Sequence, residues 1–253
     1  MQLFFKEYGQ GRAIILLHGL FGSSDNWHYI AMQLSERFHV FVLDQRNHGQ
    51  SPHSDEMNYP VMAQDVEELM ASRGLQTATL IGHSLGGKTA MQFALQFPSR
   101  VEQLIIEDMA PRAYPSVYEN YMEILLALDL RQYETRQQME EALASDIPDL
   151  TLRRFLLKNV GRDPEGKFFW KINLRGLADN AARLREPIAS SAPFTGPSLF
   201  VRGGRSDYVR GEDEALIRRL FPSAKIETIG SAGHWVHSEA PEQFMRVILG
   251  FLG

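Results

Sequence analysis

The sequence contains no cysteine among its 253 residues. This excludes disulfides, thiolate metal ligands and a cysteine nucleophile. The chain also has no apolar run long enough to cross a bilayer, and with a net charge of −5 it has no cluster of Lys or Arg suited to nucleic acid. Met1 to Glu7 lacks the basic flank and apolar core of a secretory signal. We therefore expect a cytoplasmic monomer or small homo-oligomer, with no nucleic-acid partner and no membrane insertion.

Short apolar runs alternate with amphipathic segments along most of the chain. One such segment, from Pro60 to Arg73, carries Met62, Val66 and Leu69 at helical spacing. The runs expected to form strands are Leu3 to Tyr8, Ala13 to Leu17, His39 to Leu43, Thr79 to Ile81, Val101 to Ile106, Ser198 to Val201 and Lys225 to Ile229. Strands that alternate with helices predict an α/β fold with a mostly parallel central sheet flanked by helices.

The alternation is interrupted between about Arg112 and Ala192. No buried-strand run occurs there, and apolar residues such as Ile124 and Leu128 recur at helical spacing. We interpret residues 112–192 as a helical lid inserted after the strand that ends near Asp108. The core then consists of residues 1–111 and 193–253, and the lid covers the carboxyl edge of its sheet.

The stretch Gly82-His83-Ser84-Leu85-Gly86-Gly87 lies between an apolar run and a helical segment. A serine at the apex of such a strand-to-helix turn is typical of a nucleophile elbow. The sharp turn strains the backbone of the serine, so its neighbours must be small. Gly82 and Gly86 meet that need, because a Cβ at either position would collide with the crossing strand and helix. The pattern predicts that Ser84 is a nucleophile.

A serine nucleophile needs a base to take its proton and a carboxylate to orient that base. His234 lies in a glycine-flanked loop after the last strand, and the order serine, acid, histidine fits this fold. Two amides must also stabilise the oxyanion. We expect them at Leu85, directly after the nucleophile, and at Leu20, in the loop after the first buried strand.

The chain resembles the α/β-hydrolase superfamily in His18-Gly19, in the elbow and in Gly233-His234. Three further stretches are similar to the YbfF-type esterases: Asp44-Gln45-Arg46-Asn47-His48-Gly49-Gln50-Ser51, Asp108-Met109-Ala110-Pro111 and Ala232-Gly233-His234-Trp235-Val236-His237. The resemblance spans essentially the whole chain. It implies the α/β-hydrolase fold and a carboxylesterase-like activity that needs no metal or organic cofactor.

The position of the acidic residue departs from the common superfamily pattern. When Leu199 to Gly203 is aligned with the usual strand and glycine, Ser206 falls in the acid's place and Asp207 falls one residue late. Asp108 ends the strand after the elbow helix, where some superfamily members carry their acid. The Asp-x-Ala-Pro stretch shared with the YbfF-type esterases favours Asp108 over Asp207, and both alternatives stay open.

Other candidate residues carry less weight. Phe21, Tyr121, Trp170 and Trp235 are candidate walls of a substrate pocket, although large aromatic residues are more often part of the core. His83 is expected to have a packing role. His234 and His237 are three residues apart, but without cysteine or a third ligand cluster they do not predict a metal site.

We therefore predict a serine hydrolase that cleaves small acyl esters or thioesters through an acyl-enzyme. Because the apex residue is serine, the aspartate-nucleophile chemistry of epoxide hydrolases and haloalkane dehalogenases is disfavoured. Thioester hydrolysis, carbon–carbon bond hydrolysis and perhydrolysis use the same triad and stay open. An alternative of another class is a small-molecule receptor with this fold and slow turnover.

Overall fold

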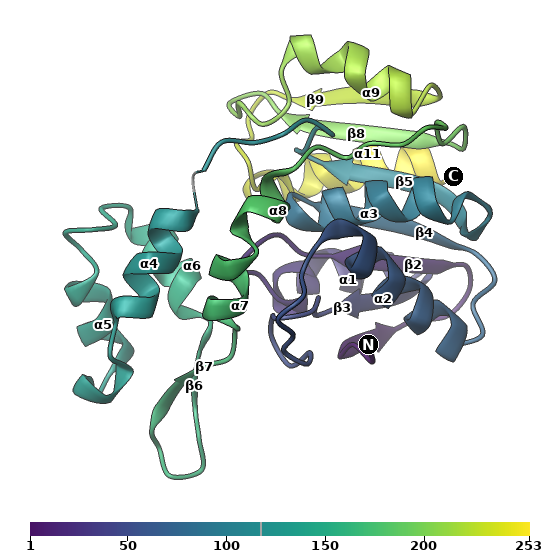
Figure 1. Cartoon of the computed structure of the whole chain (residues 1–253). Helices are drawn as coiled ribbons and strands as arrows, with labels where there is room; N and C mark the ends of the chain where they lie inside the picture. The colour runs from purple at the N-terminus through teal and green to yellow at the C-terminus, as the bar shows by residue number, and fades with distance from the viewer. Residues whose placement is uncertain (117) are drawn as a thin grey trace.

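The computed structural model describes residues 1–116 and 118–253; position 117, inside the expected lid, lies outside the described residues. A seven-stranded sheet forms the centre of the molecule (Figure 1), with the strand order β1-β3-β2-β4-β5-β8-β9. β1 pairs antiparallel with β3, and all other neighbours in this sheet pair in parallel. The strands are β1 (Phe5–Tyr8), β2 (Ala13–Leu17), β3 (His39–Leu43), β4 (Ala78–His83), β5 (Val101–Glu107), β8 (Ser198–Gly203) and β9 (Ala224–Ile229). The predicted fold class is confirmed.

Helices cover both faces of the sheet. In the core they are α1 (His28–Leu34), α2 (Tyr59–Ser72), α3 (Leu85–Gln96), α9 (Glu214–Leu220), α10 (Val236–Glu239) and α11 (Pro241–Leu252). α2 begins at Tyr59, one residue before the expected start, because the side chain of Asn58 accepts a hydrogen bond from the amide of Val61 at 3.0 Å and Pro60 occupies the first turn. In the described part of the chain, no helix combines the length and the apolar character that crossing a membrane requires.

The two faces of the sheet belong to separate apolar clusters. Ile15 and Leu17 of β2 pack with α2 and α3, whereas Ile14 and Leu16 of the same strand pack with α1 and α11. Every residue of β2 is buried. A strand covered on both faces must be apolar at every position. This is why Ala13 to Leu17 appears in the sequence as an uninterrupted run rather than as an alternating pattern.

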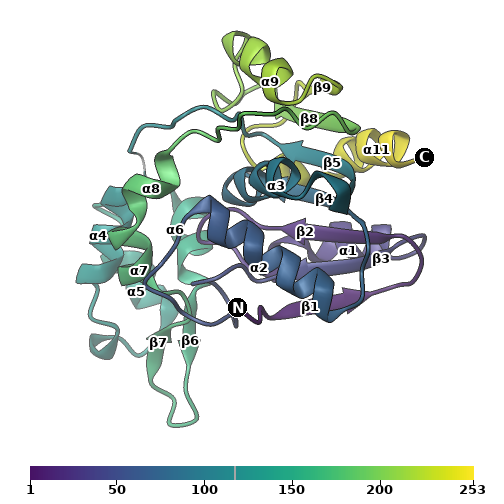
Figure 2. The same cartoon turned by 45° about the vertical axis from the view of Figure 1, so that its right-hand side comes forward.

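Between β5 and β8 the chain forms a group of elements that lies to one side of the sheet (Figures 1 and 2). They are α4 (Glu119–Ala127), α5 (Arg136–Ala142), α6 (Leu150–Leu157), β6 (Val160–Arg162), β7 (Phe168–Trp170), α7 (Leu174–Asp179) and α8 (Ala181–Arg185). β6 and β7 form an antiparallel hairpin in which Val160 pairs with Trp170. The apolar pattern did not indicate this hairpin, because its strands are three residues long and β7 is only partly buried.

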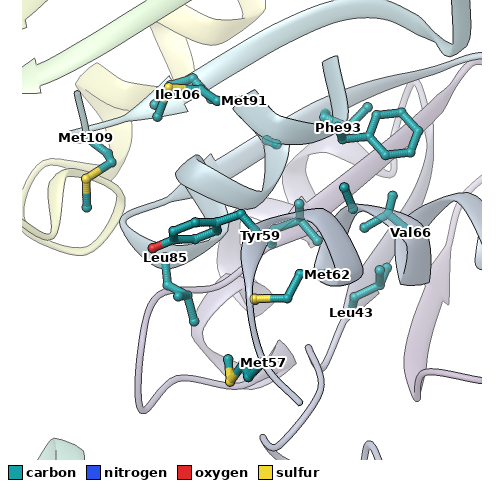
Figure 3. Close-up of a cluster of buried hydrophobic side chains, with 14 of the residues drawn as sticks. Leu43, Met57, Tyr59, Met62, Val66, Leu85, Met91, Phe93, Ile106 and Met109 are labelled. Atoms are coloured by element: carbon teal, nitrogen blue, oxygen red, sulfur yellow. The ribbon is translucent and has the colours of Figure 1, made fainter. Parts of the chain in front are cut away.

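The apolar cluster on the α2–α3 face reaches the carboxyl edge of the sheet. Figure 3 shows Leu85, the first residue of α3, and Met109, which follows β5, together with side chains of α2 and α3. Leu85 and Met109 are 4% and 5% exposed. The residues that flank the elbow and the end of β5 are therefore fixed by core packing, which limits their movement at the site above them.

Candidate active site

The elbow has the strained geometry that its sequence predicts. Ser84 lies between the last residue of β4 and the first of α3 with φ 53° and ψ −116°. Few non-glycine residues adopt a positive φ. A Cβ at Gly82 would lie 2.2 Å from the carbonyl oxygen of Gly86, and one at Gly86 would lie 2.3 Å from that of Leu17. Both glycines are thus required by the close crossing of strand and helix, as predicted.

Asp108 and His234 meet at the carboxyl edge of the sheet. Nδ1 of His234 lies 2.8 Å from Oδ2 of Asp108, and Oδ1 accepts a hydrogen bond of 2.9 Å from the amide of Gly203. Ser206 donates its hydroxyl to Oδ2. The side chain of Asp108 is 0% exposed and that of His234 is 11% exposed. The carboxylate is thus buried and contacted by three donors.

Asp207, the other candidate acid, takes a different position. Its backbone carbonyl accepts hydrogen bonds from Arg112 and Arg210, each at 3.2 Å. Its carboxylate makes no hydrogen bond among the described residues. The structure therefore brings Asp108, and not Asp207, to the imidazole of His234.

Tyrosine side chains hold the imidazole of His234 on its other side. The ring of Tyr208 stacks on it with centroids 3.6 Å apart and an interplanar angle of 18°. The hydroxyl of Tyr208 lies 2.6 Å from that of Tyr118, and burial raises the pKa of both phenols. Nε2 of His234 has no hydrogen-bond partner among the described residues. Ser84 and His234 border one small cavity, and no hydrogen bond joins their side chains.

The two expected oxyanion donors lie next to Ser84. Leu85 is the first residue of α3, so its amide has no acceptor within the helix. Leu20 borders the same cavities as Ser84. The next amide, that of Phe21, is occupied because it donates to Nε2 of His48 at 3.2 Å. Burial and the neighbouring His18 lower the pKa of His48 to about 3, so its ring stays neutral and can accept this bond.

A second pair of a histidine and a carboxylate lies behind the site. Nδ1 and the backbone amide of His237 both lie 2.8 Å from Oε1 of Glu107, the last residue of β5. Nε2 of His83 donates to the backbone carbonyl of His234 at 3.0 Å, so His83 does more than pack. Burial, together with His234 and His237, lowers the pKa of His83 well below its ordinary value. Within the described ranges, no three His, Asp or Glu side chains are grouped as a metal site would need.

A cavity of about 260 Å³ opens beside Ser84. Its lining is mostly apolar, and it includes residues from the elements between β5 and β8, namely Met122 of α4 and Ala181 and Leu184 of α8. Phe21 and Trp235, two of the expected pocket residues, border a smaller cavity with Ser84 and His234. Tyr121 and Trp170 border neither; Tyr121 lies near Tyr118 and Trp170 belongs to the β6–β7 hairpin.

Lys88 is a further residue at this site that the sequence pattern did not indicate. It lies one helical turn after Ser84 and is 1% exposed, yet it borders the cavity beside Ser84. Its Nζ lies 2.5 Å from the carbonyl oxygen of Glu186. Burial, reinforced by Arg112, lowers the pKa of Lys88 to about 7. The available signal was its spacing from the nucleophile, since residues four apart share one helix face.

The fold and this arrangement at the carboxyl edge define a member of the α/β hydrolases, and comparisons with known proteins agree. A family model described as "alpha/beta hydrolase fold" matches residues 12–241. The chain belongs to this family.

The chain is also similar to individual members of the family. It is 39% identical to the sn-1-specific diacylglycerol lipase ABHD11 of Mus musculus over 95% of this chain and 80% of the relative. It is 34% identical to esterase YbfF of Escherichia coli (strain K12), over 94% of this chain and 92% of the relative. A solved structure of a marine microorganism esterase superposes with a TM-score of 0.96 at 41% identity and covers 99% of both chains. The resemblance to the superfamily and to YbfF is confirmed.

Proposed function

We propose that this protein is a serine hydrolase that cleaves carboxylic esters through a Ser84–His234–Asp108 triad. The observation that carries the proposal is the contact of 2.8 Å between Nδ1 of His234 and buried Asp108, with Nε2 unpaired beside Ser84. The kinship to esterases and a lipase supports this class of substrate.

The reaction begins when Oγ of Ser84 attacks the acyl carbonyl and Nε2 of His234 takes the hydroxyl proton. Asp108 orients the imidazole and stabilises its protonated form. The amides of Leu85 and Leu20 bind the oxyanion of the tetrahedral intermediate, and each such donor is typically worth on the order of 100-fold in rate. His234 then returns the proton to the leaving alcohol. Water repeats the sequence on the acyl-enzyme, releasing the acid and restoring Ser84.

The cavity beside Ser84 is suited to the acyl group, because its lining is mostly apolar and Ser84 is part of its wall. We propose that residues 112–192 act as the lid of this site, since side chains from α4 and α8 complete the cavity. Phe21 and Trp235 then border the reacting atoms on the other side. A thioester fits the same chemistry, because only the leaving atom differs.

The test combines turnover with covalent labelling. Ser84→Ala should lower kcat on p-nitrophenyl esters of increasing acyl length by on the order of 10⁶-fold, and should abolish labelling by a fluorophosphonate. Ser72→Ala is the matched control, because Ser72 is an exposed residue at the end of α2. Ester turnover that persists in Ser84→Ala would refute the serine mechanism. Slow turnover in the wild type, together with ligand-dependent movement of the lid, would favour the receptor alternative.

A further inference from the structure

The apolar cavity beside Ser84 contains a cation that the ester reaction does not use. Lys88 is fully buried in α3 and borders this cavity together with Ser84 and Leu85. Its backbone amide donates to the carbonyl of Ser84 at 3.0 Å, which places the two residues one turn apart. Helical side chains lean toward the N-terminus of their helix, so the Lys88 stem leans toward the serine end of α3.

The ammonium of Lys88 is only partly satisfied. It lies 5.3 Å and 5.1 Å from the ring centroids of Tyr59 and Tyr114. A lysine ammonium has three donors, and among the described residues its one hydrogen-bond acceptor is the carbonyl of Glu186. Neither neighbouring phenol is hydrogen-bonded to this ammonium: Tyr59 donates to Leu184 O and Tyr114 donates to Tyr208 O, both at 2.6 Å.

The other cations that border the cavity differ from Lys88 in having carboxylate partners. Arg112 pairs with Asp213 at 3.1 Å, Arg185 with Glu119 at 3.0 Å, and Arg210 with Glu212 at 3.5 Å. Within the described ranges, Lys88 forms no ion pair. Burying a charge without a counter-charge costs folding free energy. An anion that enters the cavity would supply the missing partner and the missing acceptors together.

We propose that Lys88 is a specificity-determining residue that binds a carboxylate at the far end of the acyl group, so that the preferred substrates are half-esters or half-thioesters of short dicarboxylic acids. The inference rests on the proposed function, because it assigns the acyl group of that reaction to the cavity beside Ser84. The substrate ester is held at Ser84, and its distal carboxylate meets the ammonium between Tyr59 and Tyr114.

The test compares matched pairs of p-nitrophenyl esters at pH 6, with the enzyme-free rate subtracted. The half-esters of succinic, glutaric and adipic acid are paired with butanoate, pentanoate and hexanoate, which have the same numbers of carbon atoms. For at least one pair, Lys88→Met should lower the ratio of kcat/KM for the carboxylate ester to kcat/KM for the neutral ester by roughly tenfold to a hundredfold, the usual effect of losing a charge-assisted hydrogen bond. Lys225→Met, at an exposed lysine of β9, should leave all ratios unchanged.

The outcomes separate this inference from the proposed function. If Ser84-dependent hydrolysis proceeds and Lys88→Met leaves every ratio unchanged, the role of Lys88 is refuted and the hydrolase stands. Binding of glutarate and pentanoate to the wild type, measured by calorimetry, needs neither turnover nor a folded variant. Glutarate should bind at least about tenfold more tightly; equal binding would overturn the proposal, even if Lys88→Met fails to fold or esters are not cleaved.

Discussion

Ser206 donates its hydroxyl to Oδ2 of Asp108, the same carboxylate oxygen that lies 2.8 Å from Nδ1 of His234. These residues follow neighbouring parallel strands, since Ser206 comes after β8 and Asp108 after β5. The position where the superfamily commonly has its acid therefore carries a serine, and this serine contacts Asp108, the proposed acid, at the end of the neighbouring strand. The side chains that follow β5 and β8 therefore meet at one point, and a carboxylate after either strand could reach it.

Exchange of the acid for an amide should separate the two candidate aspartates. We expect Asp108→Asn to lower kcat on p-nitrophenyl butanoate by on the order of 10⁴-fold, because the imidazole loses the carboxylate that sets its tautomer. Asp207→Asn is the matched control and should lose far less, because the Asp207 carboxylate does not contact His234. Steady-state kinetics would check this. Near-wild-type activity of Asp108→Asn would contradict the assignment.

The shared location also predicts a transfer of the acid between strands. In Asp108→Asn/Ser206→Asp the new carboxylate should reach the imidazole, because the Ser206 hydroxyl already contacts the oxygen that His234 uses. We expect kcat of the double variant to be at least about tenfold higher than kcat of Asp108→Asn. This gain is a small part of the roughly 10⁴-fold effect of a triad acid. Ser206→Ala in the Asp108→Asn background controls for loss of the hydroxyl. Equal activity of the two double variants would show that position 206 cannot serve the base.

Glu107 should stabilise the folded protein through His237. Its carboxylate is fully buried and accepts from both the ring and the amide of His237, three residues after His234. Glu107→Gln should lower the free energy of unfolding by about 1–3 kcal/mol, because a buried acceptor becomes a donor facing a donor. Urea denaturation measures this change.

Glu102→Gln in the same strand is its control. Glu102 pairs with Arg12 at the surface at 3.1 Å, and such pairs contribute about 0–1 kcal/mol. Equal destabilisation by the two variants would mean that the buried contact with His237 has no special weight.

The sequence predicted those parts of the fold that local pattern determines. The bounds of β2 and β3 agree with the expected runs to the residue, and α2 differs by one residue at each end. A strand buried on both faces requires an unbroken apolar run. Such a run can be recognised in the sequence without knowledge of the tertiary structure. The elbow could be predicted from a local pattern as well, because the two glycines flank Ser84 in the sequence, although a Cβ at Gly86 would collide with Leu17 of β2.

The sequence could not decide features that depend on distant segments. Asp108 and Asp207 both follow apolar strands, so the sequence favoured Asp108 but did not exclude Asp207. What distinguishes them is that Asp108, at φ 45°, directs its carboxylate to a loop 126 positions later. The setting of Lys88 likewise depends on Glu186, 98 positions away. The spacing of residues within one helix cannot indicate a neighbour that is so distant in the sequence.

The charge of Lys88 makes the substrate preference depend on pH. Its pKa is lowered to about 7, chiefly by burial, so the ammonium is present below pH 7 and is lost as the pH rises above it. Burial raises the pKa of the phenols of Tyr59 and Tyr114, so the two rings beside the ammonium stay uncharged. The charged groups around it are Arg112, Glu119, Arg185, Glu186, Asp207 and Arg210.

The ratio of kcat/KM for the glutarate half-ester to kcat/KM for pentanoate should therefore be highest at pH 6 and should fall with a midpoint near pH 7. The two esters react through the same proposed triad, so an effect of pH on the triad cancels in the ratio. Lys88→Met should give a ratio that is low and independent of pH, whereas Lys225→Met should follow the wild type. A wild-type ratio that is flat from pH 6 to 9 would mean that Lys88 does not carry the preference.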